Sequence, residues 1–172
     1  MCFCYVICWI NTENDLCKKN YLVIMEEIMK ISTKNFGEVE ISENDIITFE
    51  QPIFGFDEYT KYIVLMDDSL NGEFIWLQSV DEPDLCFVLA NPDNLSEKYS
   101  PHFTEDVKSI IGEKIDEVWL VMVIADDFGQ STVNMRSPII MNLAQRKAAQ
   151  IILEDNYPLR YKLFESEKEE KK

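Results

Sequence analysis

The residues best suited to chemistry in this sequence are four cysteines close to its start. Cys2, Cys4 and Cys8 follow a Cys-x-Cys-x3-Cys spacing, and Cys17 comes soon after them. Thiolates at short spacing can bind a soft metal ion or respond to oxidation, so a metal or thiol sensor is one hypothesis. No second ligand pair at zinc-finger spacing follows, and Cys86 stands alone in the rest of the sequence, which weakens that hypothesis.

The other residue types that usually carry catalysis give little support to an enzyme. His102 is the single histidine, and no Gly-x-Ser-x-Gly elbow, catalytic Cys–His signature or glycine-rich phosphate loop accompanies it. Paired carboxylates fall in expected turns, where aspartate is favoured because it bonds to the backbone, and none has calcium-loop spacing. A small β-barrel enzyme is the alternative, but its metal site would usually need several histidines. We therefore expect no catalytic, cofactor-binding or metal-binding residues.

The net charge restricts the class of partner. The 172 residues include 32 acidic and 16 basic ones, for a formal charge of −16. Nucleic acid and anionic membranes repel such a chain, so we expect neither direct nucleic-acid binding nor membrane binding. Residues 29–133 hold 22 acidic and 6 basic residues, whereas residues 134–164 hold 2 and 5, including Arg136, Arg146 and Arg160. We expect an acidic surface with a local basic strip, and the acidity favours a basic protein partner.

The first 28 residues differ from the rest of the chain. Their apolar stretch, residues 2–10, is too short to span a bilayer and lacks the flanks of a signal peptide. A regular alternation of apolar and polar residues begins only at Met29. We interpret residues 1–28 as a disordered, non-native extension that arises from an over-extended start site, which N-terminal mass spectrometry of the native protein would test. Residues 29–164 then form one domain, and residues 165–172 form a charged flexible tail.

Short strands separated by turns account for most of the domain. The Asn71-Gly72 pair predicts a tight hairpin turn, and Thr104 can cap a short helix that ends before Gly112. Residues 145–148 read as a turn, and the apolar run at 117–125 reads as the most buried strand. The pattern indicates an all-β domain, an antiparallel β-barrel with one short helix. The expected strands span residues 30–35, 38–41, 45–49, 62–66, 73–80, 85–90, 117–125, 131–135, 139–142 and 149–153.

Two stretches carry polar side chains within apolar strands. Alternation places Trp76 and Gln78 on the same strand face. A buried Gln78 must find partners for its amide, so we expect it to fix a neighbouring loop or to bind a partner's backbone. Pro138, between Asn134 and Asn142, cannot donate to a ladder, so it marks a strand start or an edge that could accept a partner segment.

These stretches make the sequence resemble the FliW family of flagellar assembly factors. The most specific matches are the Leu-Gln-Ser strand at residues 77–79 and the Asn-x3-Pro-x3-Asn stretch at residues 134–142. Weaker matches follow the family's order from Met29 to about Phe164, and residues 1–28 have no counterpart. Two motifs depart from the family pattern. The family often has Gly-Leu/Ile-Pro-Gly-Phe where this chain has Pro-Ile-Phe-Gly-Phe, and Asn-Leu-x-x-Pro where it has Asn-Met-Arg-Ser-Pro.

The resemblance implies a cytoplasmic, non-enzymatic protein that binds two protein partners in turn. One is flagellin, held through its C-terminal region before export. The other is CsrA, an RNA-binding translational repressor that is antagonised away from its RNA surface. Accumulated flagellin would occupy the protein and release CsrA to stop flagellin translation, and export of flagellin would reverse the exchange.

We expect protein-binding residues of two kinds, besides Gln78, Asn134 and Asn142. A basic partner such as CsrA would contact acidic side chains, whereas an amphipathic segment of flagellin would need apolar anchors. The acidic candidates are Glu73, Asp81, Glu82 and Asp84, and the apolar candidates are Phe54, Phe56, Trp76 and Pro138.

Overall fold

The structure is a computed structural model that describes residues 28–164. Strands dominate this part of the chain, with one α-helix, α1 (Glu105–Ile111). Four short 3-10 helices lie between strands: η1 (Glu43–Asp45), η2 (Asp68–Leu70), η3 (Pro92–Asn94) and η4 (Phe128–Gln130). The strands are β1 (Ile28–Thr33), β2 (Gly37–Ser42), β3 (Ile47–Gln51), β4 (Lys61–Leu65), β5 (Phe74–Ser79), β6 (Cys86–Ala90), β7 (Glu117–Val123), β8 (Thr132–Val133), β9 (Ile139–Asn142), β10 (Lys147–Gln150) and β11 (Tyr161–Lys162).

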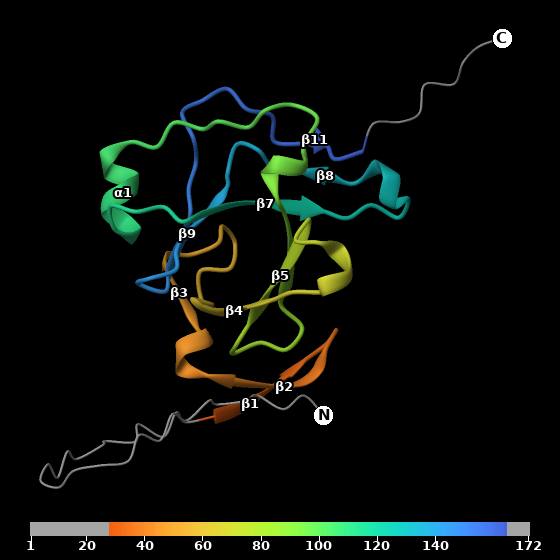
Figure 1. Cartoon of the computed structure of the whole chain (residues 1–172), viewed down its shortest axis with the longest axis vertical. Helices are drawn as coiled ribbons and strands as arrows, with labels where there is room; N and C mark the ends of the chain where they lie inside the picture. The colour runs from red at the N-terminus through yellow and green to blue at the C-terminus, as the bar shows by residue number, and fades with distance from the viewer. Residues whose placement is uncertain (1–27, 165–172) are drawn as a thin grey trace, which may run out of the picture.

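Seven of these strands close into a barrel (Figure 1). Their order is β7-β6-β5-β4-β3-β10-β9, and β9 pairs with the first half of β7 to complete the ring. Neighbours run antiparallel except β3 and β10, which pair in parallel with Thr48 opposite Lys147. The predicted all-β barrel with one short helix is confirmed, but one pair departs from the antiparallel arrangement. A closed ring of seven strands cannot alternate direction throughout, so one pair must be parallel.

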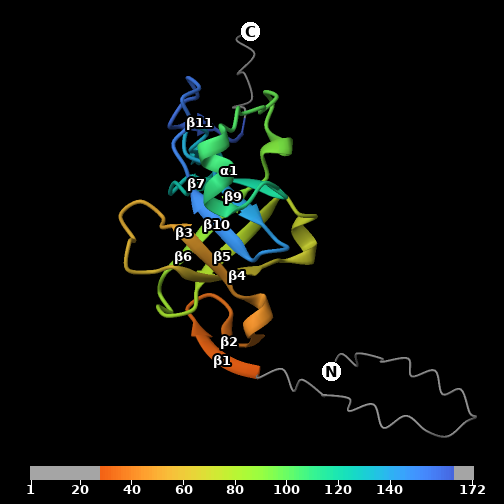
Figure 2. The ribbon, with the colours of Figure 1, turned by 90° about the vertical axis from the view of Figure 1, so that its left-hand side faces the viewer.

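The β1–β2 hairpin forms a separate two-stranded sheet against the outside of the barrel (Figure 2). Its buried Ile31 and Ile41 pack on Ile63 of β4. The next residue back along β4, Tyr62, points instead into the barrel core, because successive side chains of a strand face opposite sides. Strand β4 is therefore apolar on both faces, one face filling the barrel and the other covered by the hairpin.

Strand β7 is apolar for a similar reason, but it is not the most buried strand. Trp119 packs in the barrel core, while Leu120 and Met122 pack in a second cluster on the other face. Its end extends beyond the barrel to pair with β8, and there Val123 is 52% exposed. Strand β9, in contrast, is buried at all four positions. The prediction that residues 117–125 form the most buried strand is therefore wrong. The apolar residues of this segment continue past the part of the strand that is buried.

Local sequence signals place the turns and the helix as expected. Asn71 and Gly72 both adopt positive φ angles, 48° and 76°, as a tight turn requires. The Thr104 hydroxyl accepts from the Val107 N–H at 3.4 Å and caps α1. Gly112, with φ of 102°, ends the helix. These positions are set by backbone chemistry within a few residues, which is why the sequence predicts them.

The segment after β9 differs from the prediction. Residues 145–148 are not all turn and residues 149–153 are not a strand, because β10 begins at Lys147 and ends at Gln150. Arg146 ends the turn with a left-handed backbone, φ 53°, and its guanidinium donates to the Glu43 carbonyl at 3.3 Å. Pairing with both β3 and β9 defines β10, and the local hydrophobic pattern does not report such pairing.

The predicted extension and tail lie almost wholly outside the described residues. Ile28 is the exception, and it pairs with Ser42 in the β1–β2 hairpin. Residues 1–27 and 165–172 are not described, so both predictions stay predictions. Within residues 28–164, no helix is both long enough and apolar enough to cross a membrane.

Candidate functional site

Three chain connections meet at one end of the barrel. They are the β1–β2 turn (residues 34–36), the β3–β4 loop (residues 52–60) and the β5–β6 turn (residues 80–85). The loop that leads into β4 and the turn that leaves β5 are joined where the Val80 N–H donates to the Lys61 carbonyl at 3.0 Å. Figure 2 shows both connections on the same side of the barrel, with the β5–β6 turn next to the β1–β2 hairpin. We call these three connections together the three-loop surface.

Gln78 holds the β5–β6 turn from inside. This side chain is fully buried, and its amide nitrogen lies 3.1–3.3 Å from four backbone carbonyl oxygens of residues 79–85. The Ser79 hydroxyl accepts from the N–H groups of Asp81 and Glu82 at 3.3 and 3.1 Å. The predicted loop-fixing role of Gln78 is confirmed. Its side chain does not reach the surface, so any effect on a partner acts through the turn.

The β1–β2 turn is fastened to the same β5–β6 turn. The Lys34 N–H donates to the Pro83 carbonyl at 3.1 Å, and the Lys34 ammonium lies 3.5 Å from a carboxylate oxygen of Asp84. Next to this pair, the ring of Phe36 meets Trp76 edge to face, with ring centroids 5.5 Å apart. Backbone, charge and aromatic contacts together fix the hairpin tip beside the acidic turn.

The β3–β4 loop presents two phenylalanines at the surface. Phe54 is 44% exposed and Phe56 is 37% exposed, on either side of Gly55, whose φ of 83° lets the loop reverse. The Phe54 N–H donates to the Gln150 side-chain oxygen at 2.9 Å, which ties the loop to β10. Phe56 packs edge to face on Phe87 of β6 at 5.0 Å. The loop is therefore anchored on both sides while its aromatic tip stays accessible.

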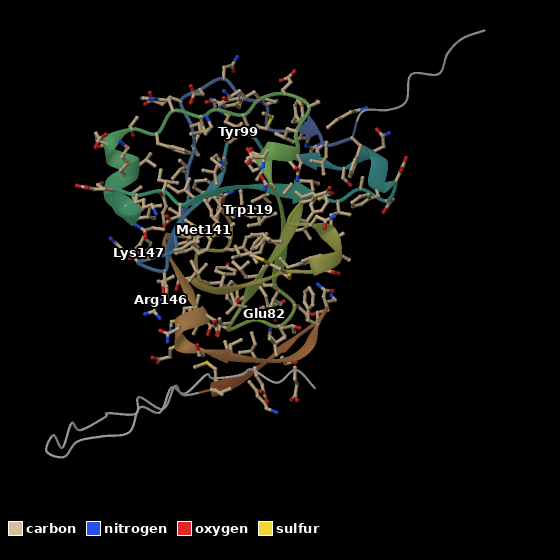
Figure 3. All side chains as sticks on the ribbon, in the orientation of Figure 1. Glu82, Tyr99, Trp119, Met141, Arg146 and Lys147 are labelled. Carbon is tan, nitrogen blue, oxygen red and sulfur yellow. The ribbon has the colours of Figure 1, made fainter. Side chains whose placement is uncertain are left out.

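Acidic side chains dominate the charge of the three-loop surface. Its residues include five acids and one base, Lys34, which pairs with Asp84. Within the described chain, the other four carboxylates make no ion pair: Asp57, Glu58, Asp81 and Glu82. Figure 3 shows Glu82 at the end of the molecule that carries β1 and β2, well away from Tyr99.

Burial holds two ionisable groups beneath these loops in their neutral forms. Burial, then the neighbouring Tyr59 and then the Asp81 carboxylate raise the pKa of Tyr62 to about 12. The Tyr62 hydroxyl is buried and has no hydrogen-bond partner among residues 28–164. Burial also raises the pKa of the Cys86 thiol, which a hydrogen bond from Asn35 partly opposes. Both groups are neutral at physiological pH, so the negative charge of this end comes from its carboxylates.

Seven predicted residues gather at this end, and Glu73 does not. The seven are the buried Gln78 and Phe54, Phe56, Trp76, Asp81, Glu82 and Asp84. Glu73 lies at the opposite end of β5, and the six residues of that strand put roughly 20 Å between Glu73 and the acidic turn. The four predicted acidic residues therefore cannot form one patch, although they are close in sequence.

Asn134 and Pro138 belong to a buried junction between β8 and β9. The Asn134 side-chain oxygen accepts from the N–H groups of Arg136 and Ser137, both at 3.0 Å. Pro138 is buried directly before β9, as the strand-start alternative predicted, and its carbonyl accepts from Ile151 at 3.1 Å. These contacts occupy the polar groups of the junction and leave Pro138 no exposed edge.

Asn142 has a similar role at the end of β9. It is 3% exposed, its amide nitrogen donates to the Ile111 carbonyl at 3.0 Å, and its oxygen accepts from the Gln145 N–H at 3.0 Å. One side chain thus joins the end of α1 to the turn before β10. In this structure Pro138 and Asn142 of the Asn-x3-Pro-x3-Asn stretch are buried and position the barrel closure, whereas Asn134 is half-buried and Arg136 is exposed.

The sequence reasoning missed several residues of the three-loop surface. Lys34 falls inside the expected strand at residues 30–35 and Phe36 directly after it, and nothing local indicates that this part of the hairpin docks on the β5–β6 turn. Asp57 and Glu58 fall between the expected strands at residues 45–49 and 62–66 and were not among the predicted acidic candidates. Their signal was available: two exposed acids directly follow the Phe-Gly-Phe tip.

The arrangement suits binding more than catalysis. Among residues 28–164, no group of three or more histidine, cysteine, aspartate or glutamate side chains could hold a metal ion. Cys2, Cys4, Cys8 and Cys17 lie outside the described residues, so the sensor hypothesis is untested. His102 is exposed in a loop, and its backbone N–H donates to the Asp155 carboxylate at 3.0 Å.

Comparison with known proteins agrees across sequence and structure. The model of the family described as FliW protein matches residues 30–163. The flagellar assembly factor FliW of Caldicellulosiruptor bescii is 36% identical over 149 residues, covering 84% of this chain and 95% of that protein. The protein of the same description from Syntrophus aciditrophicus is 40% identical over 142 residues, covering 80% and 89%. A crystal structure of the flagellar assembly factor FliW superposes with a TM-score of 0.72 at 36% identity, covering 80% of this chain and 99% of that one.

Proposed function

The chain belongs to the FliW family of flagellar assembly factors, and from this premise we propose that it binds flagellin and the translational repressor CsrA in alternation. Binding of the C-terminal region of flagellin would make it a cytoplasmic chaperone. Binding of CsrA would relieve repression of flagellin synthesis. Exchange between the two partners would couple synthesis to export.

The observation that carries this proposal is the composition of the three-loop surface. Two exposed phenylalanines, Phe54 and Phe56, lie on the same barrel end as four carboxylates without ion pairs. An amphipathic segment needs apolar anchors, and a basic RNA-binding protein is steered by unpaired negative charge. One surface offers both, so the two partners would compete by overlap.

Competition between purified proteins tests the proposal. Tagged full-length chain should retain CsrA and, separately, flagellin at moderate salt, and each partner should displace the other. Retention of neither partner would overturn the function. Simultaneous retention of both would overturn the shared surface while leaving the two activities in place.

Paired variants assign the partners to the two kinds of residue. Asp81→Lys should weaken CsrA binding more than flagellin binding, because it reverses a charge that lies in the acidic turn. Phe54→Ser should weaken flagellin binding more, because it removes an apolar anchor. Glu113→Lys and Ile152→Ser are matched controls, since both residues are exposed away from the three-loop surface. Equal losses in the control variants would contradict the assignment.

A further inference from the structure

A hollow opens at the end of β5 that faces away from the three-loop surface. Its volume is about 280 Å³. Apolar side chains from three distant parts of the chain line it: the start of β5, the end of β6 and the segment after β11. We call it the Glu73 groove, and its lining includes Glu73, Phe74, Ala90, Asn94, Leu163 and Phe164.

Exposed apolar side chains continue beyond the groove. Phe164 packs against Phe128 with ring centroids 5.1 Å apart. Phe128 is itself 52% exposed. Phe128 and Phe164, in contact with each other on a protein with this much charge, form an apolar patch of the kind that marks a binding surface.

Three carboxylates lie beside this patch, together with one base, Lys162, which is exposed directly before Leu163 and Phe164. Glu73 is exposed on the groove wall, and Asp126 and Asp127 are exposed directly before Phe128. None of the three makes an ion pair with any of the described residues. The Asp127 carboxylate accepts the Gly129 N–H at 3.1 Å. A cationic partner would therefore find carboxylates on either side of the apolar surface.

The size of the hollow further restricts the occupant. At about 280 Å³ it lies below the range of roughly 300–1,000 Å³ typical of small-molecule sites. It suits one or two anchoring side chains of a protein segment, as interface hot spots usually do. A hollow of this size between carboxylates favours an anchor that has lysine or arginine as neighbours.

We infer that the Glu73 groove docks a segment of a basic protein. One aliphatic or aromatic side chain of that segment inserts between Phe74 and Leu163, and flanking lysines or arginines face Glu73, Asp126 and Asp127. The groove is a second docking site, distinct from the three-loop surface. The inference about the groove does not depend on which partners bind the three-loop surface. It is therefore tested separately from the function proposed above.

Peptide titration with a location-resolved readout tests the inference. The probe is the capped peptide Gly-Lys-Lys-Ala-Phe-Ala-Lys-Lys-Gly, added to the ¹⁵N-labelled full chain while amide chemical shifts are followed. The largest shifts should come from Phe74, Asn94 and Leu163. Replacing the anchor phenylalanine by alanine should weaken binding about tenfold or more, and replacing the lysines by glutamates should abolish it.

Variants of the chain decide between the groove and general acidity. Glu73→Lys should lower the affinity for the phenylalanine-containing peptide about three- to tenfold, and Phe128→Ser should lower it by a similar factor. Glu113→Lys makes the same charge change elsewhere and should leave the affinity unchanged. The inference is overturned if no amide shifts, if the shifts map to residues 80–85, if the alanine peptide binds equally well, or if Glu113→Lys weakens binding as much as Glu73→Lys.

Discussion

The two ends of strand β5 are built by different means. At the end with the β5–β6 turn, the side chains of Gln78 and Ser79 form hydrogen bonds with the backbone of residues 79–85. At the other end, side chains from β5, β6 and the segment after β11 form the walls of the Glu73 groove, and its β5 and β6 walls are joined by backbone pairing, with the Asn91 N–H donating to the Glu73 carbonyl at 2.9 Å. Buried polar side chains therefore shape the first surface, whereas apolar side chains such as Phe74 and Leu163 complete the second.

This difference separates residues that shape a surface from residues that contact a partner. Gln78 shapes the acidic turn without being exposed, whereas Asp81 is exposed and makes no ion pair. Substitutions at the two positions should therefore differ in kind. Loss of Gln78 should lower stability first, and loss of Asp81 should lower only affinity. The following predictions test that separation, beginning with the largest expected effect.

Gln78→Leu should cost about 2–3 kcal/mol of unfolding free energy, because it removes the amide donor that lies against four carbonyl oxygens of residues 79–85. Urea denaturation measures this. Gln130→Leu removes an exposed amide and is the control, with an expected change within about 0.5 kcal/mol. Equal stability of the two variants would show that the turn does not depend on Gln78.

Alkaline pH should destabilise the acidic-turn end next. The pKa of Tyr62 is raised from 10.0 to about 12, so both states hold a neutral phenol below pH 10. Between pH 10 and 12 the unfolded chain loses this proton more readily than the folded one, so the stabilising contribution of Tyr62 is lost as pH rises. Between pH 10 and 12 the unfolding free energy should fall in both proteins, and the fall should be about 2 kcal/mol smaller in Tyr62→Phe than in the wild type. Parallel pH curves for the two proteins would contradict the assignment.

A tyrosine pair compares the two ends at neutral pH. The Tyr99 hydroxyl donates to the Met135 carbonyl at 2.8 Å and packs in the cluster that includes Phe74 and Leu163, so Tyr99→Phe should cost about 1 kcal/mol. The Tyr62 hydroxyl is buried without a partner in the described part of the chain, so Tyr62→Phe should be neutral to within about 0.5 kcal/mol or stabilising. Thermal unfolding of both variants checks this, and a larger cost at Tyr62 would reverse the comparison.

The smallest stability effects are expected at the exposed carboxylates of both ends. Glu73→Lys and Asp81→Lys should each change the unfolding free energy by less than about 0.5 kcal/mol, because neither side chain is buried or paired. The same denaturation assay applies. A large loss for either variant would mean that the residue shapes its surface, and any loss of binding could then not be assigned to direct contact.

Much of the fold could be predicted because its signals are local. The Asn71-Gly72 turn, the Thr104 cap and the Gly112 helix end depend on neighbouring residues only. Strand β10 could not be placed, since Lys147 begins a strand only by pairing with β3 and β9. The one parallel pair follows from the number of strands that close the barrel, which no window of sequence contains.

The candidate site was predictable residue by residue but not as a surface. Alternation along β5 identified Gln78 as an unusual amide, and burial confirms that it fixes the turn. The same local reasoning grouped Glu73 with Asp81, although β5 carries them to opposite ends. It also could not foresee that Asn134 and Asn142 bond to the backbone of the chain itself, because a polar residue that closes a barrel and one that meets a partner look alike in sequence.

The parallel pairing of β3 with β10 also has a consequence for how the chain folds. The bond from the Phe54 N–H to Gln150 joins positions 96 residues apart, and the barrel closes only when such segments meet. Distant pairings of this kind slow folding, since a large loop must be ordered before they form. During synthesis, β3 leaves the ribosome long before β10 and waits as an open edge available to other chains. Barrel closure is therefore the step that ends the period of highest aggregation risk for each new molecule.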